Sequence, residues 1–175
     1  REVEEDARRR FGDKIEIDLV SKIKDGKVMA DQGIIAGCSG GTYDNLAEAA
    51  SILKDKSVGN DYFTISAYPQ SVPVYMAATR DNIAAEMLQA GVVIKPAFCG
   101  PCFGAGDVPS NNGLSIRHTT RNFPNREGSK PGQGQISLVA LMDARSIAAT
   151  AANGGVITAA TDVEYTNEHN PYKYN

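Results

Sequence analysis

Three cysteines are the residues of this chain whose type and spacing most directly suggest chemistry. Cys99 and Cys102 flank a Gly-Pro pair in the stretch KPAFCGPCFGAGDVPSNNG, and Cys38 lies about sixty residues upstream in AGCSGGTYDN. Three thiols form neither a complete set of disulfides nor a four-thiolate zinc site. A Cys-x-x-Cys pair occurs in dithiol redox enzymes, zinc sites and iron–sulfur proteins, so the pair alone leaves the chemistry open.

Each kind of site makes a different demand on the neighbouring residues. A dithiol redox pair requires the N-terminus of a helix, and FGAGDVPSNNG contains too much Gly, Pro and Asn to begin a stable one. Zinc requires a fourth ligand, for which His118 is the nearest candidate. A cluster held by three thiolates needs none, because its open iron can bind substrate oxygen as a Lewis acid. Three unrelated buried cysteines are the remaining interpretation.

The elements that would position the thiols alternate between strands and helices. Hydrophobic patterns predict strands over residues 28–36, 61–69, 92–96 (short and buried) and 114–120, with a short final strand over 156–158. Helical periodicity predicts helices over residues 42–55 (capped by Thr42 or Asp44), 72–91 (broken near Arg80–Asp81, with Gly91 as C-cap) and 137–154 (closed by Gly154 and Gly155).

This alternation predicts a three-layer α/β/α sandwich with a largely parallel sheet. In such sheets ligands bind at the carboxyl ends of the strands. Cys38, Cys99 and the loop Thr120–Arg126 each follow a predicted strand, so we expect all of them at the same edge. Residues 99–112 are predicted to form a long irregular loop, a kind of segment that usually has a function.

The composition is that of a single soluble domain. The 175 residues carry a net charge of −3, are 42% hydrophobic and 22% charged, and contain no dense run of Lys and Arg. These values argue against nucleic acid as the main partner, and no apolar run approaches the roughly 18 residues of a membrane span. Free or metal-bound thiols suggest a reducing compartment, so we expect a cytoplasmic protein.

Both ends of the chain are predicted to connect to further domains of a longer protein. Residues 1–20 begin with the charged helical stretch REVEEDARRR, and residues 163–175 form the polar stretch VEYTNEHNPYKYN. The stretch GSKPGQGQ at residues 128–135 lacks the Gly-Lys-Ser/Thr ending of a phosphate loop. We therefore interpret it as a linker and assign it no nucleotide.

Four stretches resemble, in the same order along the chain, the aconitase-type hydro-lyases. That family includes aconitase, homoaconitase and the large subunit of isopropylmalate isomerase. The stretches are GCSGGTYDNL around Cys38, CGPCFG at residues 99–104, RNFPNR at residues 121–126 and SLVALMDARSIAATAANG at residues 137–154. The resemblance covers nearly all of residues 28–162 and matches the cluster-bearing third domain of the family.

The resemblance implies a [4Fe–4S] cluster held by Cys38, Cys99 and Cys102. Its open iron would coordinate a hydroxy-carboxylic acid during dehydration or hydration. Arg121 and Arg126 match two arginines of the family that are associated with substrate carboxylates. The residue type suits this role, because a guanidinium is a planar, permanently charged fork that matches a carboxylate.

The chain also departs from the family pattern. Gly40 and Thr120 stand where family members usually have asparagines near the cluster. Amide groups in such places tune a metal site, so we expect a hydratase with a substrate other than that of aconitase.

The family draws its acid and base groups, further arginines and a catalytic serine from other domains or a partner subunit. We therefore expect this chain alone to be inactive, and an isolated copy to lose its cluster readily. No general base is assigned, since Ser39, Thr42, Ser110 and His118 fit caps, turns or strand positions.

Two alternatives remain from other classes of protein. The first is a non-catalytic metal-binding or regulatory module that binds a partner such as RNA after its cluster is lost. The second is a Cys-x-x-Cys zinc or thiol-redox domain. Identifying the bound metal distinguishes a zinc or thiol-redox domain from a hydratase domain. Measuring RNA binding by the metal-free form distinguishes a regulatory module from a hydratase domain.

Overall fold

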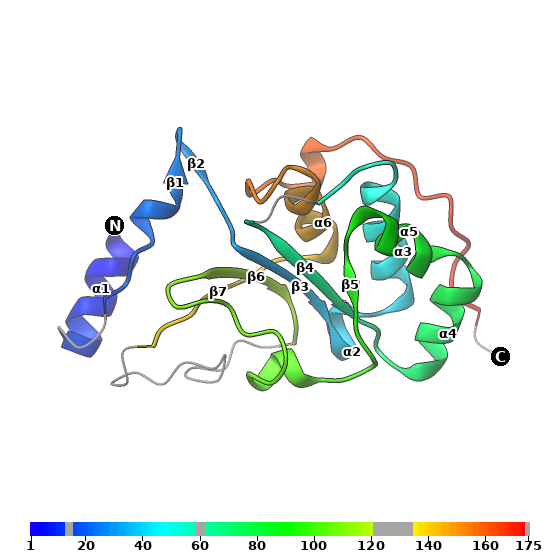
Figure 1. The fold of residues 1–175 in the computed structure, drawn as a ribbon, viewed down its shortest axis with the longest axis horizontal. Coiled ribbons are helices and arrows are strands. Elements are labelled where there is room, and N and C mark those ends of the chain that lie inside the picture. The colour runs from blue at the N-terminus through cyan, green and yellow to red at the C-terminus, as the bar shows by residue number, and fades with distance from the viewer. Residues whose placement is uncertain (13–15, 59–61, 121–134, 174–175) are drawn as a thin grey trace.

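The computed structural model describes residues 1–12, 16–58, 62–120 and 135–173. Its centre is a five-stranded sheet in which every neighbouring pair of strands runs parallel. The strand order is β5–β4–β3–β6–β7, as Figure 1 shows, with the bounds β3 Gln32–Ala36, β4 Thr64–Tyr68, β5 Val93–Ile94, β6 Leu114–His118 and β7 Leu138–Leu141. This confirms the predicted α/β architecture and its parallel sheet.

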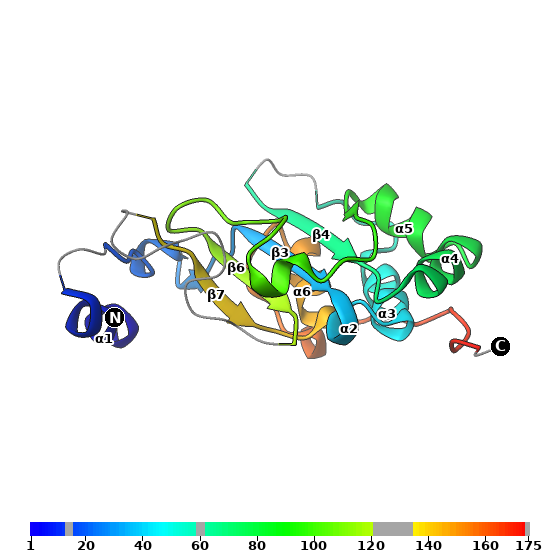
Figure 2. The same cartoon turned by 90° about the horizontal axis from the view of Figure 1, so that it is seen from below.

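Helices and short hairpin strands complete the described part of the fold. The bounds are α1 Glu2–Phe11, α2 Gly37–Gly40, α3 Tyr43–Leu53, α4 Val72–Arg80, α5 Ile83–Ala90, α6 Ala144–Ala152, with 3-10 turns η2 Val20–Lys22, η3 Gly100–Phe103 and η4 Ala160–Asp162 and the hairpin strands β1 Ile23–Lys24 and β2 Lys27–Val28. Figure 2 shows the sheet between α1 at one end and α4 with α5 at the other.

Helices α3 and α6 pack on one face of the sheet. Ile35, Ile65 and Ile116 point to this face and join the main hydrophobic core, which also contains the buried residues of both helices. The buried positions of α3 and α6 are largely alanines, and such small side chains let two helices and a sheet approach closely. The alternation of side chains along a strand explains why neighbouring Ile34 lies in a different cluster.

Ile34 and Tyr68 mark the opposite face of the sheet, where they form a small cluster with Ala36. The segment over residues 95–113, which contains η3, covers this face and is tied to it by the side chain of Arg117. The third layer therefore consists mainly of a loop with one short helical turn. The predicted irregular segment over residues 99–112 is confirmed apart from that turn.

Several helix boundaries agree with the sequence-based predictions. Thr42 caps α3, because its Oγ1 accepts a hydrogen bond from Asn45 N at 3.3 Å. The predicted break after Arg80 separates α4 from α5, and Asn82 adopts a left-handed φ of 66° there. Gly91 is the C-cap of α5, as predicted, and adopts the left-handed conformation there.

The predicted helix over residues 137–154 is wrong in its first part. Residues Leu138–Leu141 form β7 and pair with β6, and the helix α6 begins only at Ala144. Asp143 fixes this start, since its Oδ1 accepts hydrogen bonds from Arg145 N and Ser146 N. The apolar pattern of residues 138–141 fits helical periodicity as well as a strand. Their pairing with β6 is a long-range contact that the local pattern does not encode.

Three predicted strands also need correction. The predicted strand over residues 28–36 is two elements, with β2 ending at Val28 and β3 beginning at Gln32. The predicted buried strand over residues 92–96 is the short edge strand β5, in which Val93 is 48% exposed. Residues 156–158 contribute only an isolated bridge between Val156 and Met29.

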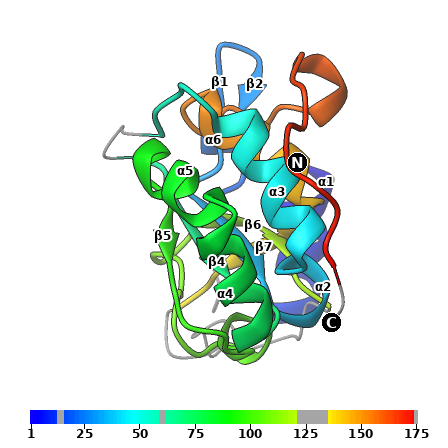
Figure 3. The same cartoon turned by 90° about the vertical axis from the view of Figure 1, so that its right-hand side faces the viewer.

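Both terminal segments pack on the domain. Residues 163–173 run along α3 (Figure 3), where Tyr165 donates a hydrogen bond to Glu48. In the same segment, His169 contacts Glu86 of α5 at 2.8 Å. At the other end, Glu4 of α1 accepts hydrogen bonds from Leu19 N and Val20 N. Whether these segments also lead into further domains stays a prediction. In the described ranges, no helix has the length and apolar character needed to cross a membrane.

Candidate metal centre

The carboxyl edge of the sheet brings together segments that are far apart in the sequence. Cys38 follows β3 in the short helix α2, Cys99 follows β5, and Thr120 follows β6. Cys38 Sγ lies 3.2 Å from Thr120 Oγ1, in hydrogen-bond contact. Because the strands run parallel, their carboxyl ends meet at one edge, and the three connections from β3 to β6 bring these groups together there.

Glycines allow the Cys38 turn to sit directly on the strand ends. A Cβ built on Gly40 would lie 2.0 Å from His118 O, and one on Gly41 would lie 1.9 Å from Tyr68 O. These distances are far below van der Waals contact, so neither position accepts a side chain without backbone movement. An asparagine, which the resemblance leads us to expect at position 40, would therefore not fit here.

Cys102 lies in the turn η3, and Cys99 is the residue that directly precedes it. Cys102 N donates to Cys99 O at 3.3 Å, and Ala105 N donates to Gly100 O at 3.0 Å, so the turn closes on itself. Cys102 is 5% exposed, whereas Cys99 is exposed. A Cβ built on Gly37 would lie 3.7 Å from Cys99 Sγ, which places Cys99 beside the Cys38 turn.

The pKa of the Cys99 thiol is raised. The main cause is a hydrogen bond with Cys102, followed by burial and by the negative charges of ionised Cys102 and Cys38. The three thiols therefore interact electrostatically, and binding a cation would favour their ionised forms. A dithiol redox site has the opposite requirement, namely a lowered thiol pKa at the N-terminus of a full helix.

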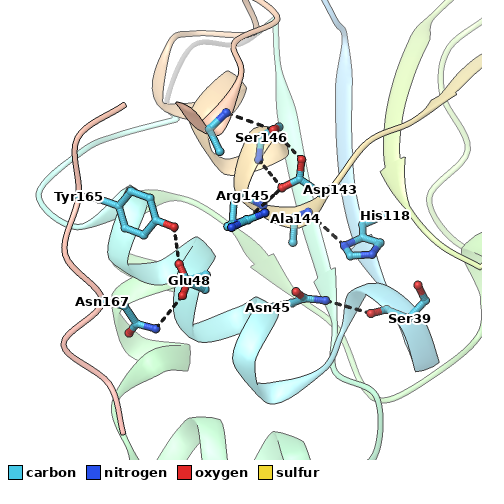
Figure 4. A network of polar contacts seen from close by, with 11 residues as sticks. Ser39, Asn45, Glu48, His118, Asp143, Ala144, Arg145, Ser146, Tyr165 and Asn167 are labelled. Carbon is cyan, nitrogen blue, oxygen red and sulfur yellow. Dashed lines mark hydrogen bonds and ion pairs between the residues drawn. The ribbon is translucent and has the colours of Figure 1, made fainter. Parts of the chain in front are cut away.

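His118, considered above as a zinc ligand, is engaged by α6. Its Nδ1 accepts a hydrogen bond from Ala144 N at 3.0 Å, and Figure 4 shows the ring facing the start of that helix. The acceptor role of Nδ1 leaves the proton of the neutral ring on Nε2. Burial lowers the pKa of His118 below its ordinary value of 6.5. The neutral ring thus supports the start of α6 together with Asp143.

No three His, Cys, Asp or Glu side chains in the described ranges are close enough to share one metal ion. This finding gives no support to a mononuclear zinc site among those residues. Thiolates of an iron–sulfur cluster bind separate irons, so they lie farther apart than ligands of one ion. The arrangement of the three cysteines remains compatible with such a cluster.

Arg117 is a site residue that the sequence reasoning missed. Its side chain is 0% exposed, and it donates to Pro101 O at 2.9 Å and to Asp107 O at 3.2 Å. Tyr68 supports the same loop by donating to Asp107 Oδ2 at 2.8 Å, and burial with this bond raises the pKa of Tyr68 to about 12. The signal available in the sequence was an arginine in the middle of the predicted strand over residues 114–120.

The two predicted substrate residues lie outside the described residues. These are Arg121 and Arg126, and most of the stretch 128–135 is outside them as well. Their predicted roles therefore stay predictions. A cavity of about 500 Å³ lies elsewhere, beside the C-terminal segment, and is lined by charged side chains that pair with one another, such as Arg80 with Asp81.

Comparison with known proteins places the chain in a family. Residues 2–149 match the sequence pattern of the Aconitase family (aconitate hydratase). The 3-isopropylmalate dehydratase large subunit of Nitratidesulfovibrio vulgaris (strain DP4) is 33% identical over 140 residues, which are 79% of this chain and 31% of that protein. The large subunit of Helicobacter hepaticus is 29% identical over 139 residues, which are 79% of this chain and 31% of that protein. The large subunit 1 of Methanopyrus kandleri is 31% identical over 121 residues, which are 69% of this chain and 29% of that protein.

The chain thus spans about a third of the length of these relatives. Family hydratases generally use a [4Fe–4S] cluster, and the relatives are large subunits of a dehydratase. The matched residues include all three cysteines, and the match extends into α6. The chain belongs to the aconitase family.

Proposed function

We propose that this chain is the cluster-binding domain of a hydratase or dehydratase that acts on a hydroxy-carboxylic acid. One observation carries the proposal: the carboxyl edge of one parallel sheet gathers Cys38, Cys99 and Cys102, whose thiols influence one another. Membership of the aconitase family gives this arrangement a reaction class, the reversible loss of water.

The three thiols fit a [4Fe–4S] cluster as a donor set. Iron in such clusters is held by thiolates. The hydrogen bond with Cys102, burial and the neighbouring thiolate charges together raise the pKa of Cys99, and bound iron would favour the ionised thiols over these effects. When bound, the cluster would supply an iron without a protein ligand that acts as a Lewis acid on substrate oxygen. Thr120 Oγ1, in contact with Cys38 Sγ, would donate a hydrogen bond to the thiolate in that state.

Arg121 and Arg126 would bind the carboxylates of the substrate, a role that follows from the resemblance of RNFPNR to the family motif. The chain spans 31% of the length of its relatives, so the remaining domains or a partner subunit would supply the acid and base groups. The chain by itself would then bind the cluster without turning over substrate.

The alternatives have less support from the described residues. A thiol-redox pair is disfavoured by the raised pKa of Cys99 and by the four-residue length of η3. A zinc site would require a ligand in place of His118, whose Nδ1 is engaged by α6. RNA binding by the metal-free form is disfavoured by the net charge of −3.

Anaerobic reconstitution with iron and sulfide tests the proposal. We expect about four irons and four sulfides per chain with a broad visible absorption, as a cubane requires. Cys38→Ser, which removes one predicted ligand, should abolish or destabilise the cluster. Ser39→Ala, at the next position of the same turn, should leave the iron content unchanged. Tightly bound zinc, or full cluster content in the Cys38→Ser chain, would contradict the proposal.

A test of the substrate class requires the complete protein. With 3-isopropylmalate and aconitate as probes, we expect Arg126→Lys to leave the iron content intact and to raise KM about tenfold or more. The reason is that lysine lacks the bidentate fork of arginine. An unchanged KM for a probe that the unmodified enzyme converts would remove Arg126 from the substrate site.

A further inference from the structure

Arg117 carries a permanent positive charge into the interior of the domain, and among the described residues it is the largest fully buried side chain. It lies on the inner strand β6, where Ile34 of β3 and Leu141 of β7 are its register partners. Burying a charge is costly unless the surroundings provide strong hydrogen-bond partners. The partners of this guanidinium therefore indicate what its burial achieves.

Two of its hydrogen bonds go to the loop that carries Cys99 and Cys102. Arg117 Nη1 donates to Pro101 O at 2.9 Å, and Nη2 donates to Asp107 O at 3.2 Å. Pro101 directly precedes Cys102, so the first bond fixes the peptide group between the two thiols. The Nε atom donates to Ser115 Oγ at 2.9 Å, which orients the guanidinium from its own strand.

A second contact holds the same loop from β4. Tyr68 OH donates to Asp107 Oδ2 at 2.8 Å, and Gly106 leaves room for it, since a Cβ there would lie 2.8 Å from the phenol oxygen. Asp107 is thus held by its backbone oxygen from β6 and by its carboxylate from β4. The loop position depends on these two inner strands.

We propose that Arg117 is a positioning residue for the iron–sulfur cluster, an inference that rests on the proposed function. Its fork fixes the backbone between Cys99 and Cys102. Its charge, in an interior of low dielectric constant, stabilises the negative charge that thiolates and cluster bring to this loop. Lysine could keep the charge but could not make both loop bonds in the same geometry.

The test uses Arg117→Lys and Arg117→Met, with Arg80→Met as the matched control, because the Arg80 side chain is 67% exposed on α4. The first readout is amide hydrogen exchange of residues 98–108 in the metal-free chain, compared with amides of α3 and α6. The second is the midpoint potential of the reconstituted cluster. The amide exchange does not depend on the cluster. If Arg117 only held the loop in place, the midpoint potential would not follow the charge of the side chain at position 117.

We expect both Arg117 variants to speed exchange in residues 98–108 about tenfold or more relative to α3 and α6, because two loop bonds are lost or weakened. The midpoint potential should become more negative in Arg117→Met and stay closer to the original in Arg117→Lys, while Arg80→Met changes neither readout. If Arg117→Met does not fold, exchange in Arg117→Lys decides the anchoring role.

Loop exchange that is unchanged in Arg117→Lys overturns the anchoring role, and a midpoint potential in Arg117→Met equal to that of the unmodified chain overturns the electrostatic role. If the unmodified chain takes up no cluster, the proposed function fails by itself. The exchange measurement then still decides whether Arg117 fixes the loop.

Discussion

Replacing Gly40 by alanine tests how the Cys38 turn is seated on the sheet. The added Cβ would lie 2.0 Å from His118 O and 3.0 Å from His118 Cβ. A carbon and a carbonyl oxygen in contact lie about 3.3 Å apart, so the turn or the end of β6 must move by more than about 1 Å. The neighbour is backbone and cannot rotate away, so the strain persists.

The expected loss of stability follows from two opposing effects. Overpacking of this kind costs about 3 kcal/mol, the upper part of its usual range. The smaller freedom of the unfolded alanine chain offsets about 0.7 kcal/mol. The net loss of about 2 kcal/mol lowers the urea midpoint by about 1 M if the slope is about 2 kcal/mol per M.

Equilibrium urea unfolding by circular dichroism measures this midpoint. Ser39→Ala is the matched control, since position 39 already carries a Cβ, and it should stay within about 0.5 kcal/mol of the unmodified chain. Reconstituted Gly40→Ala should also bind less iron, because the movement displaces Cys38. A Gly40→Ala midpoint equal to that of Ser39→Ala would refute the close packing of this turn on β6.

Two further predictions concern the core and the start of α6. Ile147 is 0% exposed, so Ile147→Ala should lower the free energy of unfolding, measured in urea, by about 2–5 kcal/mol. Leu88 is 58% exposed, so Leu88→Ala should change this free energy by no more than about 0.5 kcal/mol. Similar losses in both variants would contradict the described core. The folded pKa of His118 lies below 6.5, so the unfolded chain binds more protons and stability falls as the pH drops through that value. His118→Gln, which does not titrate, should reduce this acid-side loss in urea midpoints; an unchanged pH dependence would assign the loss to other groups.

Local signals were sufficient for much of the fold. Helix α3 was predictable because apolar residues recur at helical spacing after a capping Thr42, and the break after Arg80 was visible as polar residues between two periodic runs. The meeting of Cys38 with the end of β6 was also expected, because parallel strands present their carboxyl ends at one edge. These features depend on local pattern and on a general rule of sheet topology.

Other features depend on contacts that no local pattern encodes. Residues 138–141 form a strand only because β6 lies beside them, so their apolar run was read as part of the following helix. The polar C-terminal segment packs through tyrosines such as Tyr165, whose hydroxyl reaches Glu48 across the surface of α3 (Figure 4). Arg117 was overlooked because the sequence does not show that a loop covers its face of the sheet.

The end of β6 contacts both thiol segments that would hold the proposed cluster. Arg117 binds the backbone of the Cys99–Cys102 loop on one face, and the next carbonyl, His118 O, is where the Cys38 turn packs without a side chain at position 40. Two residues later, Thr120 contacts Cys38 Sγ itself. The proposed cluster would tolerate little change in the spacing of its thiolates, and the last residues of β6 together with Thr120 just beyond it would fix that spacing. This coupling is why a substitution on β6 should affect both thiol segments, whereas one on α4 should affect neither.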